Sequence, residues 1–258
     1  TLKNWLESGE ERFTQAEKDF MIQKYKELKT PFYYEYMDGW AALLQNISTF
    51  ILMLALVIGF LVSGIFSDEF QTKADSIFFS ARFGRSKGIS AKVGAGFCIA
   101  TGFYLMFVFL YTFIVLFILG ADGANCPIQL DLWRSVYNIT FLQTYLFIVL
   151  GGYIGTIFAA TLGMLASAFT HSTPTAVIVP FIVLCAFPFL SRIITLPGLC
   201  SFFPDQLLEI YLDIKEAGLI TLGSKVTTIA TVIVPVYAVV CLIFQPILYR
   251  VYQKVEIK

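Results

Sequence analysis

The chain has 258 residues, of which 57% are hydrophobic and only 14% are charged, and it contains 26 Phe and 13 Tyr. Soluble domains are about a quarter charged, so the surplus apolar surface must face lipid, and an ordinary soluble protein is excluded. The 18 basic residues balance the 18 acidic ones, which argues against a nucleic-acid partner, because such a partner usually requires a basic excess.

The first 41 residues are polar, with eight acidic and six basic residues. Thr14 and Glu17 have the spacing of a capping box, which predicts a helix to about Leu28 that Pro31 stops. Aromatic residues typical of a belt at the membrane headgroups follow: Tyr33, Tyr34, Tyr36 and Trp40. We interpret residues 1–41 as a solvated helix with membrane anchors; a substrate-gating role is the alternative.

Five segments are long and apolar enough to cross a bilayer, which takes about 20 residues. None of them shows the alternation of a strand, so we predict an all-α membrane protein with a transmembrane domain over residues 42–258. The predicted spans cover residues 42–66, 93–119, 141–169, 174–196 and 226–249.

Basic residues concentrate in the loop 67–92 and in the C-terminal tail. By the positive-inside rule, this loop and the tail are cytoplasmic, and residues 1–41 are extracellular. We therefore expect a multi-pass protein of the plasma membrane. The basic residues concerned are Lys73, Arg82, Arg85, Lys87, Lys92, Arg250, Lys254 and Lys258.

The cytoplasmic loop is too long for a simple turn. Asp75 to Phe83 fits a short amphipathic helix, and Gly84 fits its C-terminal stop. Such a helix can dock into a groove on a partner protein. Alternatively, its aromatic side chains rest on the lipid surface while its basic residues contact anionic headgroups.

The third predicted span has the clearest packing signal. Gly151, Gly155, Ala159, Gly163 and Ser167 recur every four residues. On a helix this spacing makes a stripe of small residues, against which another backbone can pack closely. The neighbouring helix belongs either to this chain or to a second copy, and a substrate path along the stripe is the alternative interpretation.

The outer segment 197–225 has apolar residues interspersed with acidic ones between residues 205 and 216. Pro204 starts and Gly218 ends a predicted short amphipathic helix that lies at the outer interface before the last span.

Two of the five cysteines, Cys126 and Cys200, fall in successive outer loops. An oxidising exterior permits a disulfide between them, and we hypothesise that bridge.

Signatures of enzymes and of metal sites are missing from the sequence. The only histidine, His171, falls in a short turn, and no CxxC or HExxH motif occurs. The segment from Gly218 to Lys225 imitates a P-loop, but its lysine is one place late and no strand is predicted before it. We therefore expect no catalytic residue, no metal, no cofactor and no ATP site in this chain.

The loop and its flanks resemble the permease subunits of ABC-2-type ATP-binding-cassette transporters. An acidic pair closes a span, an apolar turn follows, and a basic stretch with a glycine leads to a lysine that opens the next span. In this chain these are Asp68-Glu69, residues 77–80, residues 82–89 and Lys92. The resemblance extends over about residues 40–258, and it includes the outer amphipathic segment before the last span.

The resemblance implies a type V exporter-like bundle. The family has six spans per subunit, so a first span would precede residue 1, and residues 1–41 would join it to the next. The short cytoplasmic helix would be a coupling helix that docks on a separate cytosolic ATPase subunit, which binds ATP and Mg²⁺. The residues carried over for that contact are Glu69, Phe78, Phe79, Arg82 and Arg85.

The function implied by the resemblance is ATP-driven export of an amphipathic or hydrophobic cargo, a peptide toxin or antimicrobial peptide before others. The permease would pair with a second copy or with a related half. The alternative is a membrane sensor, or an immunity or anchoring protein, that uses residues 1–41 and no ATPase.

Overall fold

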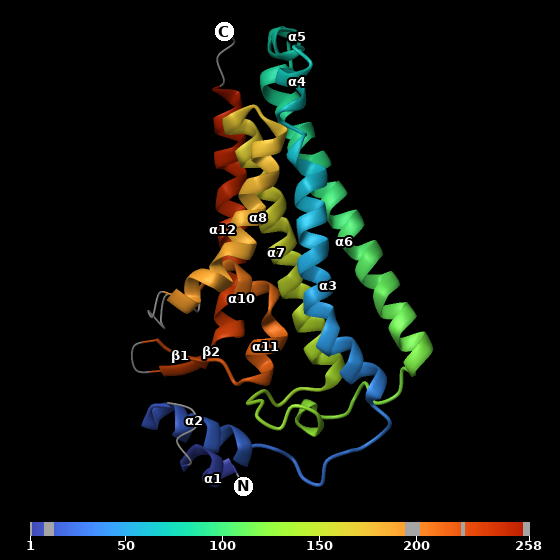
Figure 1. Ribbon diagram of the computed structural model, residues 1–258, viewed down its shortest axis with the longest axis vertical. Coiled ribbons are helices and arrows are strands. Elements are labelled where there is room, and N and C mark those ends of the chain that lie inside the picture. The colour runs from blue at the N-terminus through green and yellow to red at the C-terminus, as the bar shows by residue number, and fades with distance from the viewer. Residues whose placement is uncertain (1, 8–12, 194–201, 223–224, 255–258) are drawn as a thin grey trace.

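The computed structural model describes residues 2–7, 13–193, 202–222 and 225–254. Long helices run side by side in an upright bundle that is wider at the N-terminal end (Figure 1). The helices of this bundle are α3 (Asp38–Ser63), α6 (Ile89–Leu119), α7 (Phe141–Thr170), α8 (Thr173–Ile193) and α12 (Ile229–Gln253).

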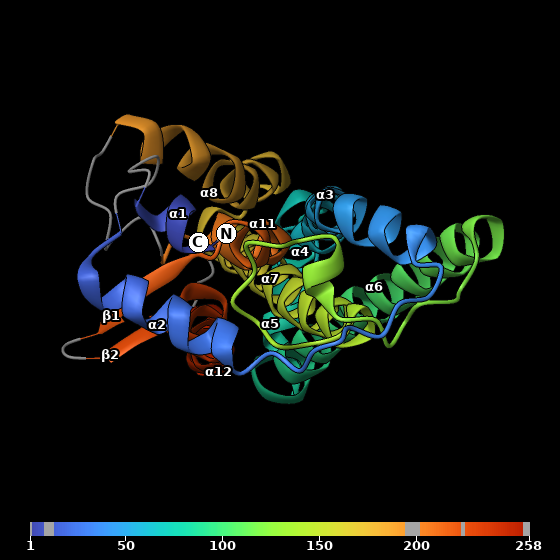
Figure 2. The ribbon, with the colours of Figure 1, turned by 90° about the horizontal axis from the view of Figure 1, so that it is seen from below.

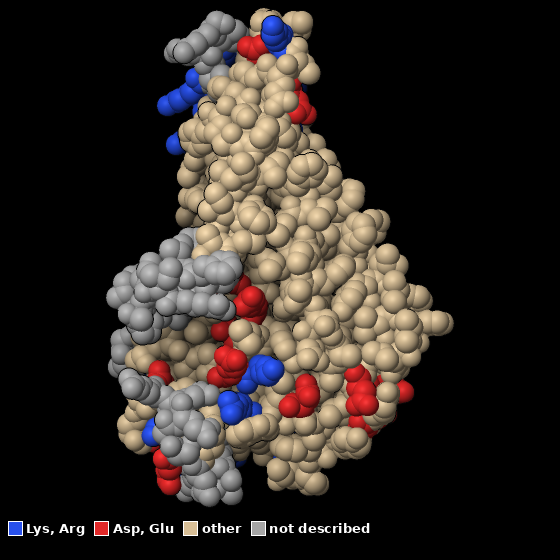
Figure 3. Space-filling view, viewed as in Figure 1, with Lys and Arg blue, Asp and Glu red and all other residues tan. Residues whose placement is uncertain are grey.

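The bundle has the apolar surface of a multi-pass membrane protein. Four of the helices, α3, α6, α7 and α12, are long and apolar enough to cross a bilayer. The helix α8 is apolar over Thr173–Ala186 and is shorter, so the count of five spans stays a prediction. On the face in Figure 3 the charged side chains gather towards the two ends, and the surface between them is largely uncharged.

The helices differ by a few residues from the predicted spans, and two of these differences have a visible reason. The helix α3 begins at Asp38, four residues before the predicted span, and Trp40 already packs into the bundle. The helix α12 begins at Ile229, three residues after the predicted span, because Lys225–Thr228 forms strand β2.

Two groups of short elements cap the bundle (Figure 1). The C-terminal end of α12 and the loop between α3 and α6 lie at one end, and the N-terminal region lies at the other, which we call the outer end. The loop end contains α4 (Asp68–Gln71) and α5 (Asp75–Ser80). The outer end contains α1 (Leu2–Glu7), α2 (Gln15–Lys26), η2 (Ile128–Leu130), α10 (Pro204–Leu208), α11 (Ile210–Lys215) and the strands β1 (Leu219–Leu222) and β2.

The helix α2 forms part of a folded cap at the outer end. Its predicted capping box is confirmed, since the Thr14 side chain accepts from the Glu17 N–H and the Glu17 side chain accepts from the Thr14 N–H. Met21 is fully buried, in a small cluster with Val136 and Ala217. Seen from below, α2 lies across this end beside β1 and β2 (Figure 2). The helix is therefore packed on the bundle as well as solvated.

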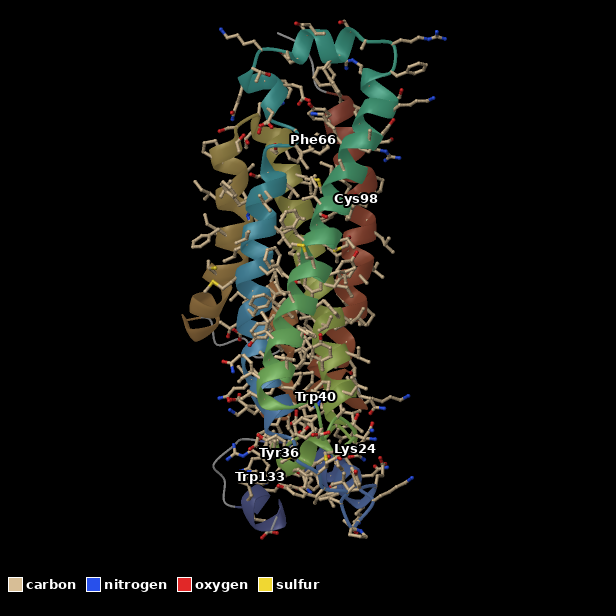
Figure 4. The ribbon with its side chains drawn as sticks, turned by 90° about the vertical axis from the view of Figure 1, so that its right-hand side faces the viewer. Lys24, Tyr36, Trp40, Phe66, Cys98 and Trp133 are labelled. Atoms are coloured by element: carbon tan, nitrogen blue, oxygen red, sulfur yellow. The ribbon has the colours of Figure 1, made fainter. Side chains whose placement is uncertain are left out.

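The aromatic residues after α2 divide into two groups. Tyr33, Tyr34 and Tyr36 are exposed, as a headgroup belt requires. Trp40 is buried instead, because its indole N–H donates to the Ala121 carbonyl at 2.9 Å. Figure 4 shows Tyr36, Trp40 and Trp133 together at the outer end and Phe66 at the opposite end.

The segment that resembles a P-loop in sequence does not have the structure of a phosphate-binding loop. Leu219–Leu222 and Lys225–Thr228 pair as antiparallel strands, with Leu219 opposite Thr228. A phosphate cradle needs a strand, a glycine loop and a helix N-terminus in series. A hairpin stands in the place of that loop.

The stripe of small residues on α7 packs against elements of this same chain. A Cβ atom added at Gly155 would lie 2.5 Å from Cδ2 of Leu208 in α10. One at Gly163 would lie 3.2 Å from the carbonyl oxygen of Gly59 in α3. The stripe therefore lets α3 and α10 approach α7 closely, as small residues do in membrane bundles.

This packing predicts a large difference between two Gly→Ala changes. Gly155→Ala is expected to lower the free energy of unfolding by about 1–3 kcal/mol, because the added methyl group overpacks the contact with α10. Gly102→Ala on α6 meets nothing within 4 Å and is expected to be neutral or slightly stabilising, because Ala favours a helix. Thermal unfolding of both variants in detergent checks this prediction, and equal midpoints would contradict it.

Candidate functional site

The loop end of the bundle is built from a series of short turns between α3 and α6. The helix α5 ends at Ser80, because Ala81 is extended with a ψ of 139°. A π-helical turn, η1 (Gly84–Gly88), then leads directly into α6. The prediction that the helix runs to Phe83 with Gly84 as its stop was therefore wrong. Gly84 is required for a different reason: a Cβ atom there would collide with the Phe78 carbonyl oxygen.

Lys92, in the first turn of α6, is enclosed at this end. Its ammonium group forms an ion pair with Glu69 of α4 and donates to the Ile65 carbonyl at 2.6 Å. Side-chain exposure is 16% for Lys92 and 20% for Glu69. Three aromatic rings surround the ammonium group, with centroids at 5.6, 4.9 and 5.5 Å: Phe66, Phe78 and Tyr252. We call Lys92, Glu69 and these three rings the Lys92 cage.

The cage joins α4 to the end of α12. The Tyr252 hydroxyl donates to the second carboxylate oxygen of Glu69 at 3.4 Å. Phe79 of α5 packs on Tyr252, with ring centroids 5.3 Å apart. Arg85 lies over the Phe79 ring at 5.0 Å and donates to the Gln253 carbonyl at 3.0 Å. Each cation held over a ring contributes about 0.5–2 kcal/mol, so α5 is fastened to α12 by several contacts.

The helix α4 is also fastened to the turn between α7 and α8. The rings of Phe70 and His171 stack with centroids 3.8 Å apart. His171 is itself the left-handed C-cap of α7, with a φ of 54°. Ser67 and Gln71 hydrogen bond to the Thr173 hydroxyl at 2.6 and 2.8 Å. A displacement of α4 and α5 would therefore reach α6, α7, α8 and α12 together.

We call the Lys92 cage together with Phe79, Arg85 and the contacts of α4 with His171 and Thr173 the joint. Four of the five predicted coupling residues belong to it. Glu69 and Phe78 belong to the cage, and Phe79 and Arg85 adjoin it. The Phe79 ring is only 5% exposed, so it holds α5 in place and offers a partner little surface. Arg82 lies apart, with its guanidinium group 5.2 Å from the exposed Phe83 ring.

An outward-facing patch remains beside the joint. Ile77 is 74% exposed and Phe83 is 50% exposed. Arg82 and Lys87 both lie over the Phe83 ring, at 5.2 and 4.9 Å. We call Ile77, Arg82, Phe83 and Lys87 the tip patch. An apolar centre with a basic rim suits a docking partner, and it also suits an anionic lipid surface.

The sequence pointed to the loop, but it did not predict that residues from other parts of the chain pack against it. Tyr252 and His171 lie far from residue 69 in the sequence, and no local pattern connects them. The sequence did contain one signal for this cluster. Lys92 is a lysine at the start of a long apolar segment, and a carboxylate pair, Asp68-Glu69, ends the preceding span.

The remaining predicted sites have different outcomes. Within the part of the chain that the structure describes, no group of three His, Cys, Asp or Glu side chains is placed to hold a metal ion. The thiol of Cys126 is buried, 4.0 Å from the Glu35 carbonyl oxygen. Cys200 lies outside the described residues, so the disulfide stays a prediction.

Comparisons of the chain with protein-family models, with curated proteins and with solved structures give no match. The resemblance to ABC-2 permeases therefore rests on the residues of the loop and its flanks. What the structure establishes is a helical multi-pass membrane protein in which the short helices of the loop end are packed against the long helices.

Proposed function

We propose that this chain is the permease subunit of an ATP-driven transporter of the ABC-2 type. It exports an amphipathic or hydrophobic cargo across the plasma membrane, a peptide before others. A separate cytosolic ATPase binds ATP and Mg²⁺, and a second copy or a related half completes the channel. The loop end and the C-terminus face the cytoplasm.

One observation carries this proposal. The tip patch is exposed, while the residues directly behind it are locked to α6 and α12 through the Lys92 cage and Arg85. A partner that pushes on the tip patch therefore moves several spans as one unit. A loop that only rested on lipid would need no such connection to the bundle.

The function is tested by ATP turnover with the cytosolic ATPase encoded nearest to this chain. Arg82→Glu is expected to reduce permease-dependent ATP turnover at least about tenfold, because reversing a charge in a docking surface removes one attraction and adds a repulsion. Phe79→Ala is expected to have the same effect by loosening α5. Lys26→Glu makes the same charge reversal at the outer end, where Lys26 is exposed, and should leave turnover unchanged.

Copurification separates this function from its alternative. A chain that acts as a sensor, or as an immunity or anchoring protein, would purify without an ATPase. The folded outer cap around Met21 and Val136 gives that alternative a surface to work with. Unchanged turnover in Arg82→Glu and Phe79→Ala, in a complex that forms normally, would sink the coupling assignment.

A further inference from the structure

A groove of about 270 Å³ lies between two of the long apolar helices. One wall belongs to α6, the other to α12, and α7 forms the base. All three helices are long and apolar enough to cross a bilayer, and Figure 4 shows α6 and α12 side by side at the level of Cys98. The side chains that line the groove include Phe97 on α6, Ala238, Cys241 and Gln245 on α12, and Tyr153 and Ile157 on α7.

Small residues of α12 leave this space open. Ala238 and Cys241 are three positions apart, which places them on the same face of the helix. Pro235 and Pro246 lie on either side of them in α12, and prolines kink a helix because they remove a hydrogen bond and clash with the preceding turn. The helix α12 therefore does not fill the space beside Phe97.

The inside of the groove offers contacts to hydrocarbon. The Tyr153 hydroxyl is paired with the Thr101 hydroxyl, with 2.9 Å between the two oxygens. The Cys241 thiol donates to the Ile154 carbonyl oxygen, 3.9 Å away. Because these polar groups are paired within the protein, a peptide backbone in the groove would leave its own N–H and C=O groups unpaired, which is costly inside a membrane. An apolar chain has no such cost.

The groove lies at the depth of the acyl chains of one leaflet. Gln245 is eight residues from the last residue of α12, Gln253, and Phe97 is eight residues from the first residue of α6, Ile89. At 1.5 Å per residue, this end of the groove is about 12 Å from the loop ends of both helices, and Ala238 is about 10 Å further towards the middle of the bundle. A phospholipid of the loop-side leaflet, with its headgroup at the helix ends, therefore has its acyl chain at the level of the groove.

Gln245 gives the groove a polar group at the end where such a lipid has its ester groups. Its amide nitrogen donates to the Thr161 hydroxyl and to the Cys241 carbonyl, both at 3.4 Å, which is longer than the usual 2.9–3.0 Å for an N–H donor. Polar side chains within spans are costly and usually functional. An ester carbonyl at this level supplies an acceptor for the amide.

The loop end next to the groove carries an excess of positive charge. Arg85 precedes α6 and donates to the Gln253 carbonyl at the end of α12, so its charge lies between the two helices that form the walls. In the described residues of this end, the stretches 67–92 and 249–254 contain seven basic and three acidic residues, and one of the acids, Glu69, is paired with Lys92. Figure 3 shows basic side chains beside the loop end of α12. This charge favours an anionic headgroup over a zwitterionic one.

We infer that this groove binds one acyl chain of an anionic phospholipid from the loop-side leaflet, with the headgroup near Arg85 and the ester groups near Gln245. The surrounding bilayer supplies this occupant. A helix of a second copy is about 10–12 Å across with its side chains, and the groove is smaller than the roughly 300–1,000 Å³ of drug-sized sites, so a single extended chain fits best. The inference goes beyond the transporter proposal and does not depend on an ATPase.

Native mass spectrometry of the purified chain tests the inference. The chain is stripped of lipid in detergent and titrated with palmitoyl-oleoyl-phosphatidylglycerol or, as the reference, with palmitoyl-oleoyl-phosphatidylcholine, which has the same acyl chains. One phosphatidylglycerol per chain is expected, bound about fivefold more tightly than the reference, which is the effect of about one basic residue near an anionic headgroup. Equal binding of the two lipids, or binding of neither, would overturn the inference.

Two tryptophan variants identify the groove as the binding place. Ala238→Trp fills the groove and is expected to weaken phosphatidylglycerol binding at least about tenfold, because the indole occupies the space of the acyl chain. Val239→Trp adds the same side chain at the next position, where Val239 is 54% exposed, and should bind the lipid like the wild type. Thermal unfolding in detergent checks that both variants fold. Loss of the lipid in both variants, or in neither, contradicts the assignment. So does a wild-type dimer that Ala238→Trp dissociates, since a second copy would then be the occupant.

A fluorescence measurement locates the acyl chain without removing it. The three native tryptophans, Trp5, Trp40 and Trp133, all belong to the outer end, so Phe97→Trp adds an indole that only a molecule in the groove reaches. Phosphatidylglycerol with brominated acyl chains, which quench an indole on contact, is added in detergent at one or two molecules per chain. The indole of Phe97→Trp is expected to be quenched, and that of Leu105→Trp, at an exposed position of the same helix, is not. Equal quenching of the two would mean that lipid coats α6 without selecting the groove.

Discussion

Lys92→Met is expected to lower the free energy of unfolding by about 2 kcal/mol, between the values for exposed and for buried pairs, because the ion pair is partly buried and its loss leaves the Glu69 charge uncompensated. Glu69 would keep its carboxylate at 20% exposure with only the Tyr252 hydroxyl as a donor. The three rings of the cage would also lose their cation. Thermal unfolding in detergent, followed by intrinsic fluorescence, measures the effect.

A second ion pair of this chain supplies the control. Nζ of Lys24 and Oε2 of Glu27 lie 2.9 Å apart at the C-terminal end of α2, with side-chain exposures of 36% and 45%. An exposed pair of this kind contributes about 0.2–1 kcal/mol, so Lys24→Met should barely move the midpoint. If Lys92→Met moves it no further than Lys24→Met does, the cage is not a structural joint.

A double-mutant cycle separates the ion pair from the packing. The double variant Glu69→Gln with Lys92→Met should be less destabilised than the sum of the two single changes, because neither residue is then left with an unpaired buried charge. In complexes with an ATPase, the same double variant should still lose part of the coupling, since α4 and α6 are no longer joined by the pair. Strict additivity would mean that the two side chains act independently.

The sequence predicted best where a local pattern decides the structure. Long apolar segments of the sequence predicted the long helices, because the ability to span a bilayer depends mainly on length and composition. The capping box at Thr14 and Glu17 gave the start of α2, because both partners lie within one turn. The same pattern recurs at Thr140 and Gln143, where α7 begins.

The candidate site was predicted only in part, because its contacts are between residues far apart in the chain. The Glu69–Tyr252 hydrogen bond spans 183 positions and the Lys92–Ile65 bond spans 27. The mixture of acidic and apolar residues predicted one amphipathic helix at the outer interface after Pro204, which the structure breaks at Glu209 into α10 and α11. It could not show that α7 has two glycines positioned to receive Leu208 and Ile210, and that contact brings Asp205 and Asp213 out of water.

The buried carboxylate of Asp213 makes the stability of the fold depend on pH. Burial, and then the charges of Glu209, Asp205 and Glu216, raise the pKa of the Asp213 carboxyl from 3.8 to about 7. Below about pH 4 the folded and unfolded chains both bind this proton. Between pH 4 and pH 7 only the folded chain keeps it, so the free energy of unfolding falls as the pH rises through this window.

The loss is complete above pH 7 and amounts to about 4 kcal/mol for a shift of this size. Asp213→Asn is expected to remove most of this slope and to be more stable than the wild type at pH 8, because the amide carries no charge to bury. A weaker slope of the same sign should remain, since burial also raises the pKa of Asp205 and Glu209. Unfolding midpoints between pH 4.5 and pH 8.5 measure it, with Asp122→Asn as the control that keeps the wild-type slope. An Asp213→Asn slope equal to that of the wild type would mean that this carboxyl is charged and solvated in the folded protein, and that α11 does not pack against the bundle as described.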